Sequence, residues 1–179
     1  MNFTATEIAG VLEIDIERHD DERGFFARAF CRDELTAHGI DFTVVQANLS
    51  GNDARGTLRG MHWQAAPVPD PKIVRCIRGH VFDVALDLRP GSPTYRRWTS
   101  TVLDAGRRNA LHIPAGCAHG FLTLAEDCEL LYLMGAPYVA DLARGARWDD
   151  PAFAIDWPEP PRRIAPRDAG WPDHAGAPG

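Results

Sequence analysis

At 179 residues, with 45% hydrophobic and 25% charged residues, the chain has the size and composition of one soluble globular domain. Its formal net charge of −6 argues against a nucleic-acid-binding surface, which normally carries a basic stripe. No apolar run approaches the roughly 20 residues of a membrane helix, and the N-terminus lacks the blocks of a signal peptide, so we expect a cytoplasmic protein with no membrane contact.

The predicted elements, in chain order, are short strands separated by turns. Strands are expected where β-branched or aromatic residues cluster and often alternate, at 11–19, 43–49, 73–79, 81–89, 98–105, 110–116, 119–124 and 128–134. Turns rich in Gly and Pro separate them. One helix is predicted at 32–38, after a mobile-looking segment, DERGFFARAF, at 21–30. Strands at this spacing without intervening helices predict an all-β fold, a β-sandwich or jelly-roll barrel with one or two short helices.

The C-terminal tail is irregular and rich in proline beyond Pro151. A solvated tail rarely carries two tryptophans, so Trp157, Ile164 and Trp171 favour a tail that packs back onto the barrel over a disordered one. The chain shows no repeat and no second set of elements. We therefore expect residues 1–179 to form a single domain, with the tail at 158–179 folded against it.

Cysteine and histidine spacing gives little support for metal chemistry. The four cysteines form no CxxC pair, and we expect them to be reduced and packed, although Cys117 beside a candidate site stays open as a reactive thiol. His62, His80, His112 and His119 could supply nitrogen ligands. They form no HxH pair, and none stands shortly before a Glu, so neither a metal nor another cofactor is expected.

Arg59 and His62 give the clearest candidate chemistry, because they lie together in the Gly-punctuated segment 46–64. Arginine supplies a permanently charged fork for phosphate oxygens, and histidine is the side chain whose ordinary pKa lies nearest neutrality. This pair suits a site that grips a phosphate and moves a proton beside it. A packed or surface histidine is the structural alternative.

Four further groups of residues could complete such a site. They are His119 in the segment 114–121, Lys72 before an apolar strand, Tyr132 with Tyr138 nearby, and Arg23 with Phe25 and Phe26. Each also has a purely structural interpretation: an exposed hairpin imidazole, a charge that guards a sheet edge, a packed tyrosine, or a turn with exposed charges. From the residues alone, both interpretations stay open.

Taken in order, these motifs resemble the sugar-nucleotide 3,5-epimerases. The resemblance runs from about residue 10 to 168 and rests on DERGFF (21–26), the segment from Gln46 to Gln64, Lys72, the segment 81–95, IPAGCAHGF (113–121) and RGARWDDPAFAIDWP (144–158). It implies a cupin-type jelly roll, usually a homodimer, without a catalytic metal. It also implies epimerisation at C3, C5 or both of a nucleoside-diphosphate 4-keto-6-deoxy sugar, of the dTDP-4-dehydro-6-deoxyglucose type.

The resemblance also assigns roles to individual residues. His62 would be the base that removes a proton beside the ketone, and Asp168 would orient its imidazole. Lys72 would stabilise charge on O4, and Tyr132 would return a proton from the opposite face. The substrate-binding residues would be Arg59 and Arg23 at the diphosphate, Gln46, Asn48, Phe26 and Tyr138 around nucleotide and sugar, Arg28 near the base, and His119 in the cavity wall.

Two departures from the family pattern leave the nucleotide open. Arg28 and Ala143 stand where the family's prototypes carry glutamates, one of which accepts a hydrogen bond from thymine. Arginine only donates hydrogen bonds and suits the acceptor edge of cytosine, so a CDP-linked 4-keto-deoxyhexose 5-epimerase is an alternative. A related keto-sugar isomerase, a non-catalytic sugar-binding barrel and a metal-dependent cupin enzyme are further alternatives.

Overall fold

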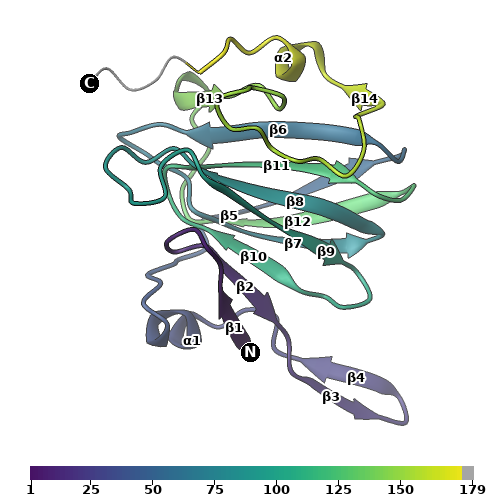
Figure 1. Cartoon of the computed structure of the whole chain (residues 1–179). Helices are drawn as coiled ribbons and strands as arrows, with labels where there is room; N and C mark the ends of the chain where they lie inside the picture. Colours follow the sequence, from purple (N-terminus) through teal and green to yellow (C-terminus); the bar gives the residue numbers. More distant parts are fainter. Residues whose placement is uncertain (175–179) are drawn as a thin grey trace.

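A computed structural model describes residues 1–174, which form two mostly antiparallel β-sheets facing each other, with short helices outside them (Figure 1). The first sheet contains, in spatial order, β1 (Asn2–Ala5), β2 (Leu12–Asp15), β10 (Ala110–Ile113), β7 (Lys72–Arg78), β12 (Cys128–Met134) and β5 (Gln46–Asn52). The second sheet contains β13 (Ala143–Gly145), β6 (Thr57–Gln64), β11 (Cys117–Thr123), β8 (His80–Asp87) and β9 (Trp98–Asp104), and β14 (Arg163–Ile164) pairs in parallel with β6.

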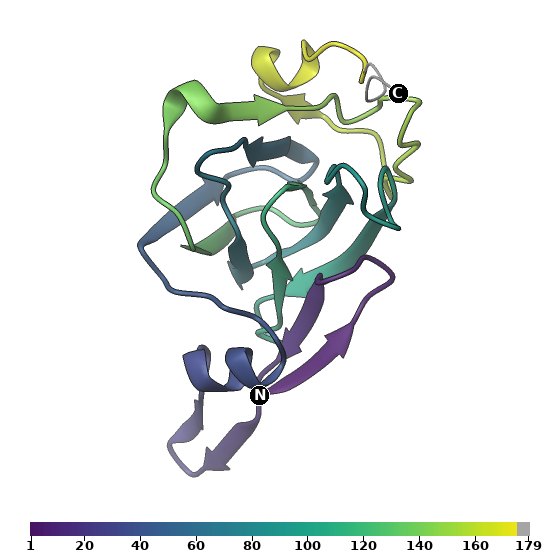
Figure 2. The same ribbon diagram turned by 90° about the vertical axis from the view of Figure 1, so that its left-hand side faces the viewer.

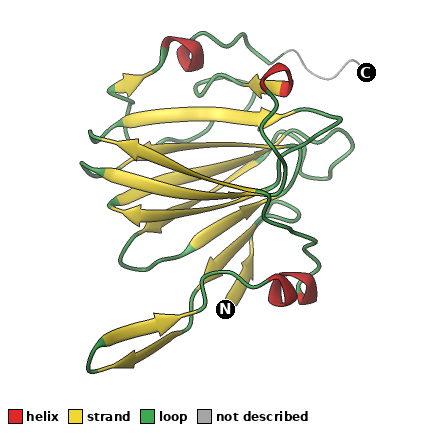
Figure 3. Ribbon diagram, turned by 180° about the vertical axis from the view of Figure 1, so that it is seen from behind, coloured by secondary structure: helices red, strands yellow, loops and turns green. Residues whose placement is uncertain are grey.

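The remaining elements are peripheral to these sheets. A separate hairpin is formed by β3 (Arg18–Asp21) and β4 (Gly24–Ala27). The helices are α1 (Arg32–Ala37), the 3-10 helix η1 (Ala140–Leu142) and α2 (Pro166–Ala169), and Figure 3 shows how little of the fold is helical. Among residues 1–174, no helix is long and apolar enough to cross a membrane.

The main core lies between the two sheets, because alternate residues of each strand point to the same face. The first sheet contributes Val74 and Leu130, and the second contributes Val81 and Phe121, all at most 1% exposed. A second cluster forms where Phe153 and Trp157, beyond β13, cover the outer face of the second sheet. A third cluster packs α1 and Phe42 against the outer face of the first sheet. The predicted all-β jelly-roll sandwich with short helices is confirmed.

Most of the predicted strands are confirmed, as is the helix at 32–38. The predicted strand at 11–19 is wrong in its extent, because β2 ends at Asp15 and a separate strand, β3, begins at Arg18. The segment at 21–30 supplies β4, whose residues are largely exposed, so its sequence shows no alternation of apolar and polar residues. Figures 1 and 2 both place this hairpin at the end of the molecule opposite the C-terminal tail.

The tail packs against the second sheet, as its tryptophans predict. Trp157 donates a hydrogen bond from Nε1 to the Trp148 carbonyl at 2.9 Å and packs edge-on against Phe82. Further along, β14 adds to β6, and the ring of Trp171 lies directly against Gly145. The last five residues of the predicted tail, 175–179, lie outside the described residues.

The cysteines take the expected structural role. All four are free thiols, three of them buried and Cys31 partly buried. Burial raises the pKa of the Cys117 thiol to about 12. The thiolate is the reactive form of cysteine, so Cys117 is not suited to be a nucleophile near neutral pH.

Candidate active site

Two histidines from neighbouring strands lie side by side in the second sheet. His62 on β6 is the register partner of His119 on β11, and the register shifts just beyond this pair. At this point a Cβ on Gly60, whose φ is +129°, would lie 2.5 Å from the Cα of Gly120. Glycine is therefore required for β6 and β11 to approach each other immediately before His62.

His62 forms a hydrogen-bonded pair with a carboxylate from the tail. Its Nε2 lies 2.7 Å from Oδ1 of Asp168, which is 5% exposed, and the Gly60 N–H donates to Oδ2 at 3.2 Å. Burial by itself raises the pKa of Asp168, but the hydrogen bonds from His62 and Gly60 outweigh it and lower the pKa overall. An ionised carboxylate only accepts hydrogen bonds, so Nε2 of neutral His62 carries the proton and Nδ1 keeps its lone pair.

A cavity of about 350 Å³ opens between the two sheets beside this pair. The second sheet contributes Arg59, His62 and His119 to its wall. The other polar residues of the cavity wall come from the first sheet and are Asn48, Ser50, Lys72 and Tyr132. Because His62 and Tyr132 come from opposing sheets, a ligand in this cavity has one of them on each side.

Lys72 is buried in the cavity wall, and Tyr132 is partly buried there. Lys72 is 4% exposed, and its Nζ lies 2.8 Å from Oδ2 of Asp70, itself bonded to the Gln64 N–H. Burial, and then the nearby charge of Asp83, raise the pKa of Tyr132 above its ordinary value. The phenol therefore keeps its proton at neutral pH and can donate it to a basic carbon.

The mouth of the cavity carries an anchored guanidinium and two amides. Arg59 donates from Nε to Asn52 Oδ1 at 2.7 Å and from its terminal nitrogen to the Gly51 carbonyl at 3.2 Å. These bonds leave further N–H donors of an exposed, oriented guanidinium for an anion. Gln46 and Asn48 bond to each other at 2.9 Å, so they form one polar unit on β5.

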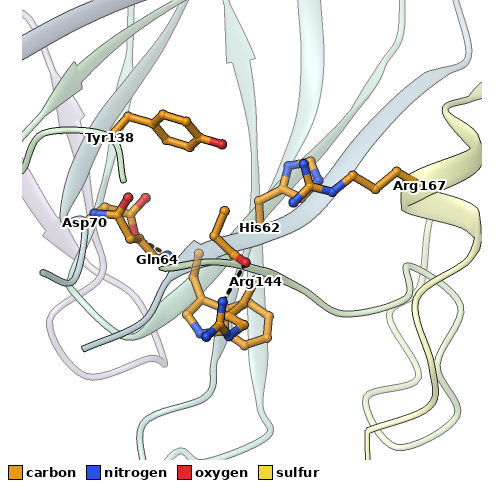
Figure 4. Close-up of a pocket in the computed structure, with 8 residues that line it drawn as sticks. His62, Gln64, Asp70, Tyr138, Arg144 and Arg167 are labelled. Carbon is orange, nitrogen blue, oxygen red and sulfur yellow. Dashed lines mark hydrogen bonds between the residues drawn. The ribbon is translucent and has the colours of Figure 1, made fainter. Parts of the chain in front are cut away.

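A second cavity of about 250 Å³ adjoins the first through His62 (Figure 4). Tyr138 points across it, and its main-chain N–H donates to Gln46 Oε1 at 3.2 Å. Ala143 lines this space, where its small side chain leaves room. Arg144 and Arg167 also line it and were not predicted. Arg167 could have been predicted from the sequence, because it directly precedes the predicted catalytic residue Asp168.

Four of the predicted binding residues line neither of these cavities: Gln46, which bonds to Asn48 and to the Tyr138 N–H, and three residues near the hairpin. Arg23, Phe26 and Arg28 lie on or next to the projecting hairpin. The side chain of Arg23 is 84% exposed and pairs with Asp21 at 2.5 Å, and Phe26 is 77% exposed. Arg28 pairs with Glu34 at 2.5 Å. Within one chain these three residues therefore lie away from His62, because the hairpin points away from its cavity.

The side chains of residues 1–174 form no cluster of three or more His, Cys, Asp or Glu that could hold a metal ion. The two histidines of the cavity are instead each bonded to a carboxylate, His62 to Asp168 and His119 to Asp83, both at 2.7 Å. Such pairs suit proton transfer and hydrogen bonding to a ligand.

Comparisons with known proteins agree with this geometry. The family model described as dTDP-4-dehydrorhamnose 3,5-epimerase matches residues 5–175. The dTDP-4-dehydrorhamnose 3,5-epimerase of Sinorhizobium fredii is 43% identical over 159 residues, which cover 89% of this chain and 82% of the relative. The dTDP-4-dehydrorhamnose 3-epimerase of Streptomyces niveus is 41% identical over 169 residues, covering 94% and 81%.

Solved structures give the same picture. The epimerase of Legionella pneumophila, solved in complex with dTDP-4-keto-L-rhamnose, superposes with a TM-score of 0.88 at 35% identity, covering 94% of this chain and 89% of the other. An epimerase of Mycobacterium tuberculosis superposes with a TM-score of 0.91 at 36% identity, covering 97% and 88%.

Proposed function

Because the chain belongs to the dTDP-4-dehydrorhamnose 3,5-epimerase family, we propose that it inverts C3, C5 or both of a dTDP-linked 4-keto-6-deoxy sugar. The chain is accordingly an epimerase, an isomerase of nucleotide sugars. The observation that carries the proposed chemistry is the placement of the His62–Asp168 pair and Tyr132 on opposite walls of one cavity. We further propose that residues 1–179 act as one domain.

The first proposed step is removal of a proton from the carbon next to the ketone. Such a proton is acidic because its loss gives an enolate, with charge on O4. His62 would take the proton on Nδ1, and the Asp168 carboxylate at 2.7 Å would stabilise the imidazolium that forms. The buried ammonium of Lys72 would lie near O4, where a fixed cation stabilises charge that appears in the transition state.

The second proposed step is return of a proton to the other face of the same carbon. Tyr132 would donate its phenolic proton as the enolate collapses to the ketone, which inverts the carbon. This step leaves a Tyr132 phenolate and a His62 imidazolium, and exchange with water restores both. If His62 returns the proton instead, the carbon keeps its configuration, so the outcome depends on competition between the two groups.

Substrate binding is proposed to use the polar residues around the cavity mouth. Arg59 would bind the diphosphate, with Gln46, Asn48 and Tyr138 around nucleotide and sugar, and His119 in the cavity wall. The names of the relatives support dTDP over the CDP alternative. Among these relatives are both 3,5-epimerases and a 3-epimerase, so the number of inverted carbons is left to experiment.

We also propose a homodimer in which the hairpin serves the partner's site. Phe26 and Arg23 are strongly exposed in one chain, where they contact neither cavity of His62. Val45, before β5, and Leu49, on β5, are also exposed, at the opposite edge of the first sheet. Exposed apolar side chains such as these are typical of residues that are covered in a protein–protein interface. Exchange of the hairpins would supply Arg23, Phe26 and Arg28 to the nucleotide.

Solvent deuterium uptake tests this function directly. The protein would be incubated in D₂O with a 4-keto-6-deoxyglucose nucleotide, offered in dTDP and CDP forms, and followed by NMR. We expect deuterium and inversion at C3, C5 or both with the dTDP form. No uptake with either nucleotide would refute the epimerase function, and uptake with the CDP form alone would refute the choice of nucleotide.

A further inference from the structure

Asp83 is a buried carboxylate behind the cavity wall that has no role in the steps above. It lies on β8, is 0% exposed, and its Oδ2 accepts a hydrogen bond from His119 Nε2 at 2.7 Å. Its other oxygen, Oδ1, has no hydrogen-bond partner among residues 1–174. A buried carboxylate that is only half satisfied is costly to stability, which suggests a function.

The partner of Asp83 lies between the two proposed catalytic groups. His119 is 5% exposed and is the cross-strand neighbour of His62. Its ring also meets the ring of Tyr132 edge to face, with centroids 5.7 Å apart and planes at 75°. The bond to Asp83 thus fixes the orientation of an imidazole that supports the Tyr132 ring.

The charges around this pair bear on the proton that Tyr132 gives up. Burial raises the pKa of Asp83, and His119 and Lys72 lower it only in part. The Asp83 charge in turn raises the pKa of Tyr132, after the larger effect of burial. That charge by itself opposes donation, so the support for Tyr132 has to come from geometry: Asp83 accepts a hydrogen bond from His119 Nε2 and thereby holds the imidazole against the Tyr132 ring.

We propose that Asp83 is a positioning residue for the second proton transfer, acting through His119 to support donation by Tyr132. This inference rests on the proposed function and deepens it. The first transfer, to His62, uses a different carboxylate, Asp168, from a different element. Asp83 is therefore expected to control whether the enolate inverts or returns to its starting configuration, with little effect on how often it forms.

The test is the ratio of deuterium uptake with retained configuration to uptake with inversion, measured in D₂O with the dTDP-linked keto sugar. Asp83→Asn keeps the side chain's shape and removes its charge. Because general acids contribute roughly 10²- to 10⁴-fold to rates, partial loss of one should raise this ratio by about tenfold or more. His119→Gln removes the other half of the pair and should raise the same ratio. It provides the test if Asp83→Asn does not fold.

Asp87→Asn is the matched control. Asp87 is also buried on β8, but it bonds to Arg89, Ser92 and Thr94 instead of a cavity residue. The Asp87→Asn variant should have a lower melting temperature and an unchanged ratio of retention to inversion. A wild-type ratio in both Asp83→Asn and His119→Gln would overturn the inference while leaving the proposed function intact. Absence of any uptake by the wild-type protein would remove the proposed function and this inference with it.

Discussion

The contact between His62 and Asp168 gives the sharpest single prediction for activity. Asp168→Asn is nearly isosteric, but it removes the charge that faces Nε2 of His62 at 2.7 Å. Asp168 is buried, so water screens this interaction weakly on the carboxylate side, whereas the His62 side chain is 44% exposed. A hydrogen bond to a charged group contributes about 1.5–3 kcal/mol. If this energy is lost in the transition state, kcat falls roughly 10- to 150-fold.

The amide of asparagine can also reverse the hydrogen bond and place the proton on Nδ1, which would block the base. The loss should therefore fall on kcat more than on KM, measured by NMR or coupled reduction of the product. Asp150→Asn is the matched control, because Asp150 is also buried, and among residues 1–174 its side chain bonds only to the main-chain N–H groups of Ala152 and His174. Equal losses of kcat in both variants, or no loss in Asp168→Asn, would refute the reasoning.

Three further predictions concern the tail, acid stability and the dimer. In Gly145→Ala the new Cβ would clash with the Trp171 ring. We therefore expect the free energy of unfolding to fall by about 1–3 kcal/mol and kcat to fall as well. Unchanged denaturation and kinetics would contradict the packing of Trp171 on Gly145. Burial raises the pKa of Asp87, but hydrogen bonds from a guanidinium and two hydroxyls lower it overall. The ionised Asp87 side chain therefore stabilises the fold fully above its unfolded pKa of about 4, and this stabilisation is lost as the pH falls toward the folded pKa. Below pH 4, the melting temperature of Asp87→Asn should fall less steeply with falling pH than that of the wild-type protein. Equal slopes would contradict the stabilising role of the Asp87 charge. Mixing His62→Ala with Arg23→Ala protein should restore activity in about a quarter of the sites if hairpins act in the partner; no restoration would mean that they do not.

Strand positions were largely predictable because the core strands carry a clear apolar alternation. In β7, for example, Val74 and Cys76 point into the core while Arg75 between them does not. The β3–β4 hairpin lacked this signal, because all of its residues except Ala27 are exposed. Its conformation depends on a turn and on packing outside the two sheets, which a pattern of alternate burial cannot reveal.

The site was predictable only where a motif or a resemblance supplied long-range information. His62 and Asp168 are 106 residues apart, and no local pattern joins them until the tail packs on β6. Asp83 was missed, although an acidic residue within the apolar run 81–89 was a usable signal of a buried partner. The exposure of Arg23 could not be foreseen, because the position of a projecting hairpin is set by tertiary structure.

The most direct measurement compares deuterium uptake by the wild-type, His62→Ala and Tyr132→Phe proteins with the same dTDP-linked keto sugar in D₂O. We expect uptake with inversion in the wild-type protein and loss of uptake in His62→Ala. In Tyr132→Phe we expect uptake with retained configuration, because the base still removes and returns the proton. Uptake that persists in His62→Ala, or inversion that persists in Tyr132→Phe, would contradict the assignment of base and acid to opposite walls of the cavity.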